Sequence, residues 1–192
     1  MSRLDLVVGP NGSGKSTFVR LVLAPALPST SFVNADEIAA REWPDDPEAH
    51  AYEAAAMAAT TRSRLIELGL PLIAETVFSH PSKLELVDEA SAAGYYLALH
   101  VLMVPEDLAV ARVDYRLASG GHRVPVDKIR QRYRRLWANV VEAVPKAGSA
   151  TFWDNSPLDG PRRVAMFIEG FVVGRPLWPA WTPPTVTTRW PA

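Results

Sequence analysis

The 192-residue sequence contains no cysteine, and this absence excludes three kinds of chemistry. The chain can form no disulfide bond, use no thiol nucleophile and offer no thiolate ligand to a metal ion. The sequence also lacks any run of about 18 uncharged apolar residues, the length that a membrane-spanning helix requires. Because the first residues, MSRLDLVVG, hold too short an apolar run for a signal peptide, we expect a cytoplasmic protein without a membrane partner.

An excess of charge of either sign is also missing. The 20 basic and 21 acidic residues give a net charge of −1 at pH 7. No global field therefore draws the chain to nucleic acid or to an anionic membrane, and phosphate binding must depend on a local cluster of basic residues. The hydrophobic fraction of 48% and charged fraction of 21% are ordinary for a globular protein, and the length fits one α/β domain.

Short apolar runs alternate with helical patterns along the chain. This alternation predicts an α/β fold, whose parallel sheet is covered by helices on both faces and binds ligands at the carboxyl ends of its strands. A hairpin at the sheet edge is expected over 164–173, with a short helix as the alternative. We expect strands over 4–8, 32–33, 70–74, 95–104 and 151–153, and helices beginning at 15, 35, 47, 81, 105 and 127.

The last residues differ in composition from the rest, so we divide the chain into an α/β domain, 1–174, and a tail rich in proline and tryptophan, 175–192. The tail holds five prolines, which argue against a regular element, and tryptophans at 178, 181 and 190, which argue against disorder. We expect it to pack across the surface of the domain rather than to bind a partner.

The stretch GPNGSGKS, residues 9–16, matches the phosphate-loop pattern in full and lies between a predicted strand and a predicted helix. Its glycines let backbone N–H groups point at phosphates; Lys15 reaches the β and γ oxygens, and Ser16 ligates magnesium. A turn that only caps a helix would need neither side chain. We therefore expect ATP and Mg²⁺ as cofactors, with ATP bound by Gly9, Pro10, Asn11, Gly12, Ser13, Gly14, Lys15, Ser16 and Thr17.

Carboxylates follow the second and third predicted strands, in NADE and AETVFS. A kinase of small hydroxyl compounds needs such a group near the γ-phosphate. We take Asp36 as the catalytic base, and Glu75 with Thr76 as residues that bind the acceptor. The alternatives are a helix N-cap for Asp36 and a solvent-exposed loop carboxylate for Glu75.

Basic residues concentrate between positions 112 and 135, where seven arginines and one lysine face two aspartates. Two helices joined by a glycine hinge at 120–121 would form a lid that closes arginines over the transferring phosphates. The alternatives are a solvated basic face and a nucleic-acid surface that uses Tyr133 and Trp137. We rank nucleic acid lower, because those rings lie in or beside the apolar stripe formed by Ile129, Tyr133, Leu136, Val140 and Val144.

Five blocks, spread over residues 4–156, together resemble the zeta-toxin kinase family, in particular its short stand-alone members often described as predicted ATPases. The blocks are GPNGSGKST, NADE, AETVFS, ARVDYRLASGGHRVP with the following IRQRYRRL, and WDNS. The resemblance implies an adenylate-kinase-like fold with sheet order 2-3-1-4-5. It also implies transfer of the γ-phosphate of ATP to a hydroxyl, which in the toxins belongs to UDP-N-acetylglucosamine.

The resemblance assigns roles to residues of this chain. It places Asp36 on the base, Glu75 and Thr76 in the acceptor region, and Asn155 beside the adenine. Its phosphate-clamping arginines fall on Arg116 and Arg130, with Arg112 and Arg132 as the alternatives. We include Arg112 and Asn155 among the ATP-binding residues and Arg123 among the substrate-binding residues.

We expect a magnesium-dependent kinase of a small hydroxyl compound such as a sugar nucleotide or nucleoside. An antitoxin is the protein partner that the resemblance implies. Dependence on one is not expected, because larger toxins engage it with chain ahead of the phosphate loop and only eight residues precede Gly9 here. The rival hypotheses are a nucleotide-gated switch that hydrolyses ATP slowly, and a kinase or ATPase of nucleic-acid ends.

Overall fold

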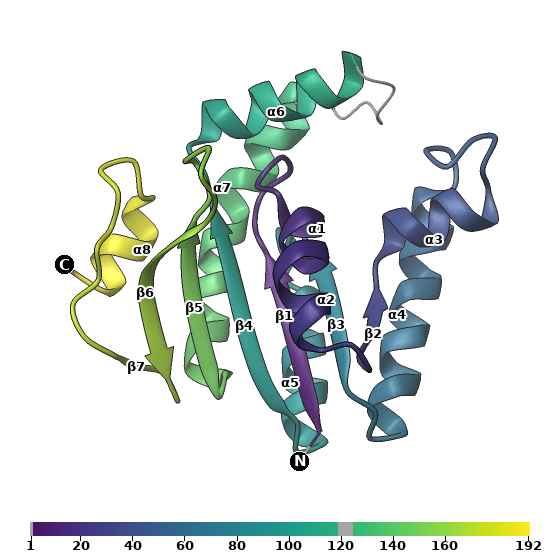
Figure 1. Cartoon of the computed structure of the whole chain (residues 1–192), viewed down its shortest axis with the longest axis horizontal. Coiled ribbons are helices and arrows are strands. Elements are labelled where there is room, and N and C mark those ends of the chain that lie inside the picture. Colours follow the sequence, from purple (N-terminus) through teal and green to yellow (C-terminus); the bar gives the residue numbers. More distant parts are fainter. Residues whose placement is uncertain (1, 119–124) are drawn as a thin grey trace.

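The computed structural model describes residues 2–118 and 125–192 and is built around one sheet with the order β2-β3-β1-β4-β5-β6-β7 (Figure 1). The first five strands of this order pair in parallel, and β6 and β7 continue the sheet as an antiparallel hairpin. This confirms the expected order 2-3-1-4-5 and the edge hairpin. The strands are β1 (Arg3–Val8), β2 (Ser31–Val33), β3 (Leu72–Thr76), β4 (Tyr96–Met103), β5 (Ser149–Asp154), β6 (Arg162–Ile168) and β7 (Phe171–Val172).

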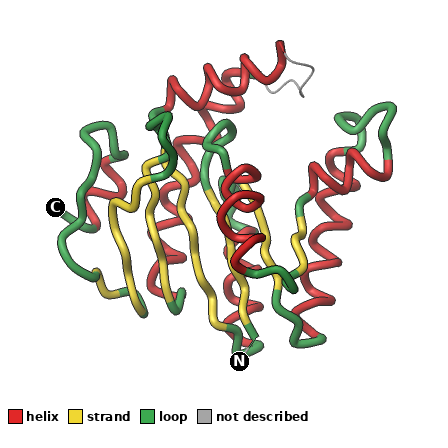
Figure 2. The backbone as a smooth tube through the Cα atoms, in the orientation of Figure 1, coloured by secondary structure: helices red, strands yellow, loops and turns green. Residues whose placement is uncertain are grey.

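Helices cover both faces of the sheet, as Figures 1 and 2 show. One face packs against α1 (Lys15–Phe18), which continues through a π-helical turn, η1 (Val19–Leu23), into α2 (Ala24–Ala26). None of the described helices is long and apolar enough to span a bilayer. The other helices are α3 (Ala35–Glu42), α4 (Ala51–Glu67), α5 (Lys83–Ala92), α6 (Glu106–Ala118), α7 (Val126–Ala143) with a 3₁₀ turn, η2 (Val144–Lys146), and α8 (Pro184–Arg189).

The alternation of side chains along β1 explains why the core has two layers. Leu4, Leu6 and Val8 point into the main cluster, which includes residues of α5 and α7, whereas Val7 points into a smaller cluster with Phe18 of α1. All four β1 side chains are fully buried. A strand buried on both faces reads as a continuous apolar run, which is why such runs located the strands in the sequence.

Helix α7 confirms the predicted apolar stripe and corrects its predicted start. Tyr133 and Trp137 are buried in the main cluster, and the Tyr133 hydroxyl donates to the Val104 carbonyl over 2.9 Å. The predicted N-cap, Asp127, was wrong, because the helix begins at Val126 after Pro125 and has no side-chain cap. Asp127 lies in the first turn, where its charge complements the helix dipole.

The tail packs on the main core, as expected, but it contains a helix that its proline content had argued against. Helix α8 begins at Pro184, directly after Pro183. A proline at the first helical position loses no hydrogen bond there and its ring fixes a helical φ, so proline favours a helix start even though it breaks a helix interior. Val186 of α8 is fully buried. The division at residue 174 stays a prediction.

Two tryptophan rings pack the tail against the sheet. The Trp190 ring lies 4.7 Å from the Phe167 ring and 6.0 Å from the Phe152 ring, measured between centroids. The Trp178 ring lies 5.2 Å from Phe152, and its Nε1 donates to the Trp190 carbonyl over 2.7 Å. The two tryptophans therefore cover β5 and β6 together.

We expect Trp190→Ala to lower the free energy of unfolding by about 2–3 kcal/mol, because it uncovers two core phenylalanines. Urea denaturation measures this change. The control is Leu177→Ala, since Leu177 is also apolar and in the tail but is 69% exposed, and its loss is expected to cost less than about 0.5 kcal/mol. Equal effects of the two substitutions would contradict a fastening role for Trp190.

Candidate active site

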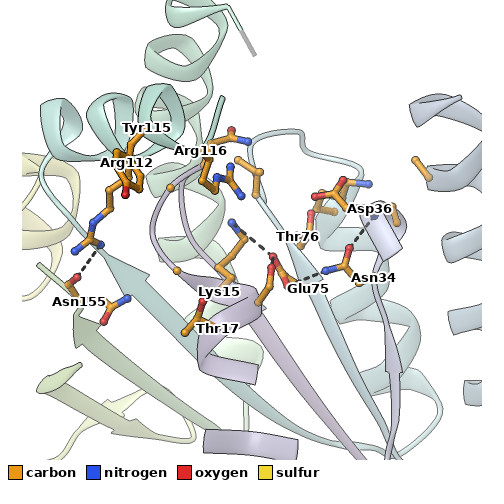
Figure 3. A pocket seen from close by; sticks show the side chains of 18 of the residues that line it. Lys15, Thr17, Asn34, Asp36, Glu75, Thr76, Arg112, Tyr115, Arg116 and Asn155 are labelled. Atoms are coloured by element: carbon orange, nitrogen blue, oxygen red, sulfur yellow. Dashed lines mark hydrogen bonds and ion pairs between the residues drawn. The ribbon is translucent and has the colours of Figure 1, made fainter. Parts of the chain in front are cut away.

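A pocket of about 690 Å³ lies at the carboxyl ends of the parallel strands (Figure 3). Its walls come from the phosphate loop, the residues after β2, the end of β3, helix α6, and Asn155 after β5. Helices α4 and α5 also contribute, with Arg62 and Lys83. The position is the one where open parallel sheets bind ligands.

The phosphate loop has a backbone that only glycine can adopt without strain. Gly12 and Gly14 have φ of +75° and +86°, in the left-handed region. A Cβ at Gly12 would lie 2.4 Å from the Ala109 carbonyl oxygen, and one at Gly14 would lie 2.5 Å from Asn155 Nδ2. The loop therefore packs tightly against α6 and the end of β5, with α1 beginning directly after it.

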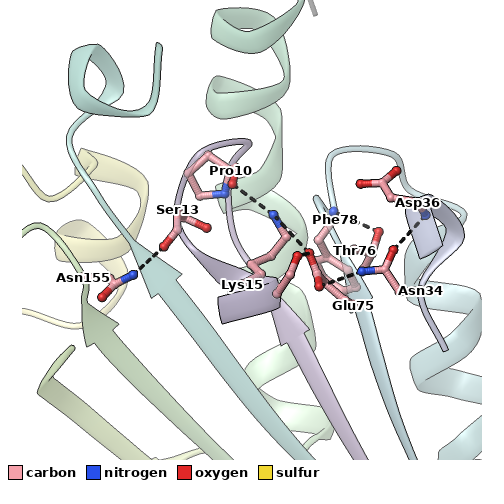
Figure 4. A network of polar contacts seen from close by, with 10 residues as sticks. Pro10, Ser13, Lys15, Asn34, Asp36, Glu75, Thr76, Phe78 and Asn155 are labelled. Carbon is pink, nitrogen blue, oxygen red and sulfur yellow. Dashed lines mark hydrogen bonds and ion pairs between the residues drawn. The ribbon is translucent and has the colours of Figure 1, made fainter. Parts of the chain in front are cut away.

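Hydrogen bonds hold Asn155 and Arg112 on one side of the loop (Figures 3 and 4). Asn155 Nδ2 donates to the Ser13 carbonyl over 2.7 Å, and Arg112 Nη1 donates to the Asn155 carbonyl over 2.9 Å. Both residues line the pocket, as the predicted ATP-binding roles require. Ser13 itself is fully buried, so it shapes the loop from within.

Glu75 occupies the centre of the site (Figure 4). Its Oε1 accepts a hydrogen bond from Ser16 Oγ over 3.0 Å and lies 4.0 Å from Lys15 Nζ, while its Oε2 accepts from Asn34 Nδ2 over 2.9 Å. Lys15 Nζ also donates to the Pro10 carbonyl over 3.0 Å. The structure therefore places Glu75 against the phosphate loop, which excludes the alternative of a solvent-exposed loop carboxylate.

Burial favours the neutral form of both Lys15 and Glu75. It lowers the pKa of the Lys15 ammonium, against the opposing charges of Glu75 and Asp36. It raises the pKa of the Glu75 carboxyl, against the Lys15 charge and the Ser16 hydrogen bond. Phosphate oxygens beside Lys15 would favour its protonated form, so the site gains electrostatic stability when it holds an anion.

Asp36 is not the cap of helix α3, because Asn34 has that role. Asn34 Oδ1 accepts the backbone N–H of Asp36 over 2.8 Å. The Asp36 carboxylate lines the pocket on the side of Lys15 opposite Arg112 and Asn155 (Figure 3), and no described residue forms a hydrogen bond with it. The capping alternative for Asp36 is therefore excluded, and its carboxylate faces the pocket.

Thr76 lines the same side of the pocket as Asp36 (Figure 3). Its Oγ1 accepts the backbone N–H of Phe78 over 3.3 Å, which leaves its hydroxyl hydrogen available to donate. Phe78 is buried with φ of +63°, a strained value for an aromatic residue, and its carbonyl accepts from Asn139 Nδ2 over 2.9 Å. This buried turn fixes where Thr76 points.

The structure separates the predicted phosphate-clamping arginines. Arg112 and Arg116 of α6 line the pocket, as their shared helix face predicted. Arg130 of α7 is outside the lining and donates to Glu106 over 3.2 Å and to Asp107 over 2.8 Å. Arg123 and the glycine hinge at 120–121 lie outside the described residues.

Several residues of the pocket were not predicted from the sequence, among them the polar or charged Asn34, Arg62 and Lys83. Asn34 had a usable signal, since asparagine directly before a helix is a common N-cap. Arg62 and Lys83 had none, because each is an ordinary charged residue of a helix and only the packing of α4 beside α5 brings both to the site.

Comparison with known proteins supports this description of the fold. A family model described as an AAA domain matches residues 4–136. The fold is similar to a chain of the AvrRxo1-ORF1:-ORF2 complex with ATP, with a TM-score of 0.71 at 17% identity. That similarity covers 90% of this chain and 60% of the other, so this chain spans less than two thirds of the AvrRxo1 chain.

Two further solved structures have a similar fold. PezAT, a chromosomal toxin–antitoxin system of Streptococcus pneumoniae, gives a TM-score of 0.62 at 15% identity, over 80% of this chain and 67% of the other. The Pnkp1/Rnl/Hen1 RNA repair complex gives 0.60 at 22% identity, over 73% of this chain and 46% of the other. No curated protein sequence matches the chain. Together, the family model and these structures show an α/β P-loop kinase fold.

We expect Gly12→Ala to weaken ATP binding by roughly tenfold or more, because the new Cβ would meet backbone of α6 that cannot move aside. Isothermal titration of ATP in the presence of Mg²⁺ measures the change. Gly94→Ala is the matched control, since its φ of +73° imposes similar strain while nothing lies within 4 Å of the added Cβ. Gly94→Ala is expected to lose about 1 kcal/mol of stability, and Gly12→Ala is expected to lose more because of its clash. Equal ATP affinity in the two would contradict the predicted clash.

Proposed function

The chain belongs to the AAA domain family, and from this premise we propose that it is an ATP-dependent kinase of zeta-toxin type that phosphorylates a hydroxyl group of a small molecule. One observation carries the proposal. The carboxylate of Asp36 and the ammonium of Lys15 line the same pocket, after the carboxyl ends of β2 and β1, the two strands that flank β3 in one parallel sheet. A base and a phosphate-binding cation in one pocket are what phosphoryl transfer to a hydroxyl requires.

The nucleotide would bind along the phosphate loop. Backbone N–H groups at the start of α1 and the Lys15 ammonium suit the β- and γ-phosphates. Arg112 and Asn155 lie on the side of the loop opposite Asp36, so the adenosine end would extend toward them and leave the γ-phosphate facing Asp36. The AvrRxo1 complex with ATP supports ATP as the nucleotide of this fold.

Magnesium fits the oxygen atoms of Ser16 and Glu75. The Ser16 hydroxyl and the Glu75 carboxylate lie 3.0 Å apart, and Mg²⁺ takes oxygen ligands together with phosphates and water. The described residues contain no cluster of three acidic or histidine side chains that could hold a metal without a nucleotide. When bound, the ion would neutralise charge on the β- and γ-phosphates.

In the proposed reaction, the acceptor hydroxyl forms a bond to the γ-phosphorus while the bond to the β-phosphate oxygen breaks, leaving ADP. Asp36 orients the hydroxyl and takes its proton, and the ammonium of Lys15 and the guanidinium of Arg116 stabilise the charge on the transferring oxygens. Arg116 has this role here because it lines the pocket, whereas Arg130 is paired with Glu106 and Asp107.

The acceptor would occupy the side of the pocket that holds Asp36 and Thr76. The Thr76 hydroxyl can donate to it, and a sugar nucleotide or nucleoside is the acceptor class that the zeta-toxin likeness suggests. Glu75 belongs to the phosphate-loop side in this proposal, because its oxygens are used by Ser16 and Asn34. An antitoxin remains a candidate partner through the likeness to PezAT.

Action on nucleic-acid ends is the weaker alternative. The likeness to an RNA repair complex at 22% identity shows a shared fold alone. Tyr133 and Trp137 are buried, so the described part of α7 offers no stacking rings, and two of its arginines, Arg130 and Arg134, are paired with acidic residues of α6.

We expect Asp36→Asn to reduce phosphoryl transfer by about 10²- to 10⁴-fold, because an amide cannot take the proton of the acceptor. Purified protein is incubated with labelled ATP and a metabolite extract, and the compound that gains a phosphoryl group is identified by mass. ATP binding, measured by titration, is expected to stay unchanged.

Glu37→Gln provides the control, since Glu37 is an exposed acid of the same helix turn outside the pocket lining. This variant is expected to keep full transfer activity. Transfer by Asp36→Asn at the unmodified rate would refute the proposed base. Nucleotide binding without transfer to any compound would favour the nucleotide-gated switch instead.

A further inference from the structure

Two basic side chains line the pocket away from the phosphate loop. Arg62 belongs to α4 and Lys83 is the first residue of α5, and these helices pack beside each other (Figure 1). Both side chains are half-buried. They also line an adjoining recess of about 200 Å³ between α4, α5 and β3, which shares Glu75 and Thr76 with the main pocket and is also lined by Glu85 and Glu89. The main pocket therefore has a pair of cations apart from Lys15 and the arginines of α6.

Neither cation has a close side-chain partner in the described structure. Glu89 and Glu85 line the same recess and attract Arg62 and Lys83, respectively. The Glu89 carboxylate accepts a hydrogen bond from Ser63 Oγ over 3.3 Å, and Glu85 is exposed to solvent. Among residues 2–118 and 125–192, the side chain of neither Arg62 nor Lys83 forms a hydrogen bond or a close ion pair. Half-buried charges without a close partner are unfavourable, which points to a missing anion.

The two cations also repel each other. Burial lowers the pKa of Lys83, and the nearby positive charge of Arg62 lowers it further. A guanidinium and an ammonium that line one pocket from two packed helices offer a site for an anion, which would relieve the repulsion and accept charge-assisted hydrogen bonds from both.

The phosphates of ATP are not the anion that this pair suits. They are provided for by the phosphate loop, Lys15 and the start of α1, whereas Arg62 and Lys83 come from elements that contribute nothing to that loop. The recess that the pair lines continues from Thr76, on the acceptor side. The pocket thus has one cationic end for the donor and another for a second molecule.

We propose that Arg62 and Lys83 form a second anion site, which binds a phosphate or carboxylate group of the acceptor. The identification of this ligand as the acceptor rests on the proposed kinase function; the binding of an anion does not. The acceptor then carries an anion for Arg62 and Lys83 and a hydroxyl for Asp36. A small phosphorylated or carboxylated polyol has both groups, whereas a neutral nucleoside would leave the two cations without a partner.

The test uses the full chain with Mg²⁺ and a non-hydrolysable ATP analogue, which fills the phosphate loop. Inorganic phosphate and, in a parallel arm, acetate are titrated into this complex and followed calorimetrically. We expect Arg62→Gln and Lys83→Gln each to weaken binding of the preferred anion by roughly tenfold or more, the usual loss for one charge-assisted contact. Their affinity for the ATP analogue is expected to stay unchanged, which shows that the variants fold.

Arg64→Gln is the matched control. It removes the same charge from the same helix as Arg62→Gln, but Arg64 is exposed and paired with Glu67 over 2.8 Å. It is expected to bind the anion like the unmodified chain. Phosphate in preference to acetate identifies a phosphate ester, and the reverse order identifies a carboxylate. The proposal is overturned if the loaded chain binds neither anion, or if both Gln variants bind as well as Arg64→Gln.

This outcome is separate from that of the kinase proposal. If no compound gains a phosphoryl group in the extract but phosphate still binds through Arg62 and Lys83, the second anion site stands and the kinase function fails. If an acceptor is found and its KM is unchanged in Arg62→Gln and Lys83→Gln, the kinase function stands and the second anion site is overturned.

Discussion

The buried carboxylate of Glu75 is the constraint on which the rest of the site depends. A carboxylate with a side chain only 9% exposed is stable only if charged or polar partners surround it, and here Ser16, Lys15 and Asn34 provide them. These partners come from the phosphate loop after β1 and from the end of β2, while Glu75 belongs to β3. One side chain therefore links the ends of three strands, and it lies between the side of the pocket that holds Asn155 and the side that holds Asp36.

Asn34 connects the Glu75 carboxylate to the side of the pocket that holds Asp36. Its amide nitrogen donates to Glu75 and its amide oxygen caps α3, so a single planar group links the buried charge to the helix that carries Asp36. The amide cannot rotate without losing one of the two bonds. The same hydrogen-bond network therefore positions Asp36 and holds Lys15. A change at Lys15 is expected to alter the position of Asp36, and the reverse.

Local sequence patterns predicted the phosphate loop and the strands better than they predicted the contacts between residues in the pocket. The phosphate loop and the strand positions could be read from the sequence because a glycine pattern and buried apolar runs are local features, whereas the strand order was predicted only from the zeta-toxin resemblance. The roles of Glu75, Arg62 and Arg130 could not, because each depends on a residue far along the chain: Ser16 for Glu75, the packing of α5 for Arg62, and the acids at the start of α6 for Arg130. The helix in the tail was not predicted for a different reason. Proline was taken as a residue that disrupts helices, although it is favoured at the first position of a helix.

The two carboxylates of the pocket have environments that suit different tasks. Glu75 accepts two hydrogen bonds and faces Lys15, so a proton taken up there would break contacts that hold the phosphate loop. Asp36 is exposed, and no hydrogen bond from the described residues holds its carboxylate. The role that we propose for Asp36 therefore makes no demand on the buried network, whereas Glu75 suits the fixed charge that we propose beside the phosphates. Arg62 and Lys83 line the same pocket from α4 and α5 and have no contact with that network, so an anion bound to them would leave it undisturbed.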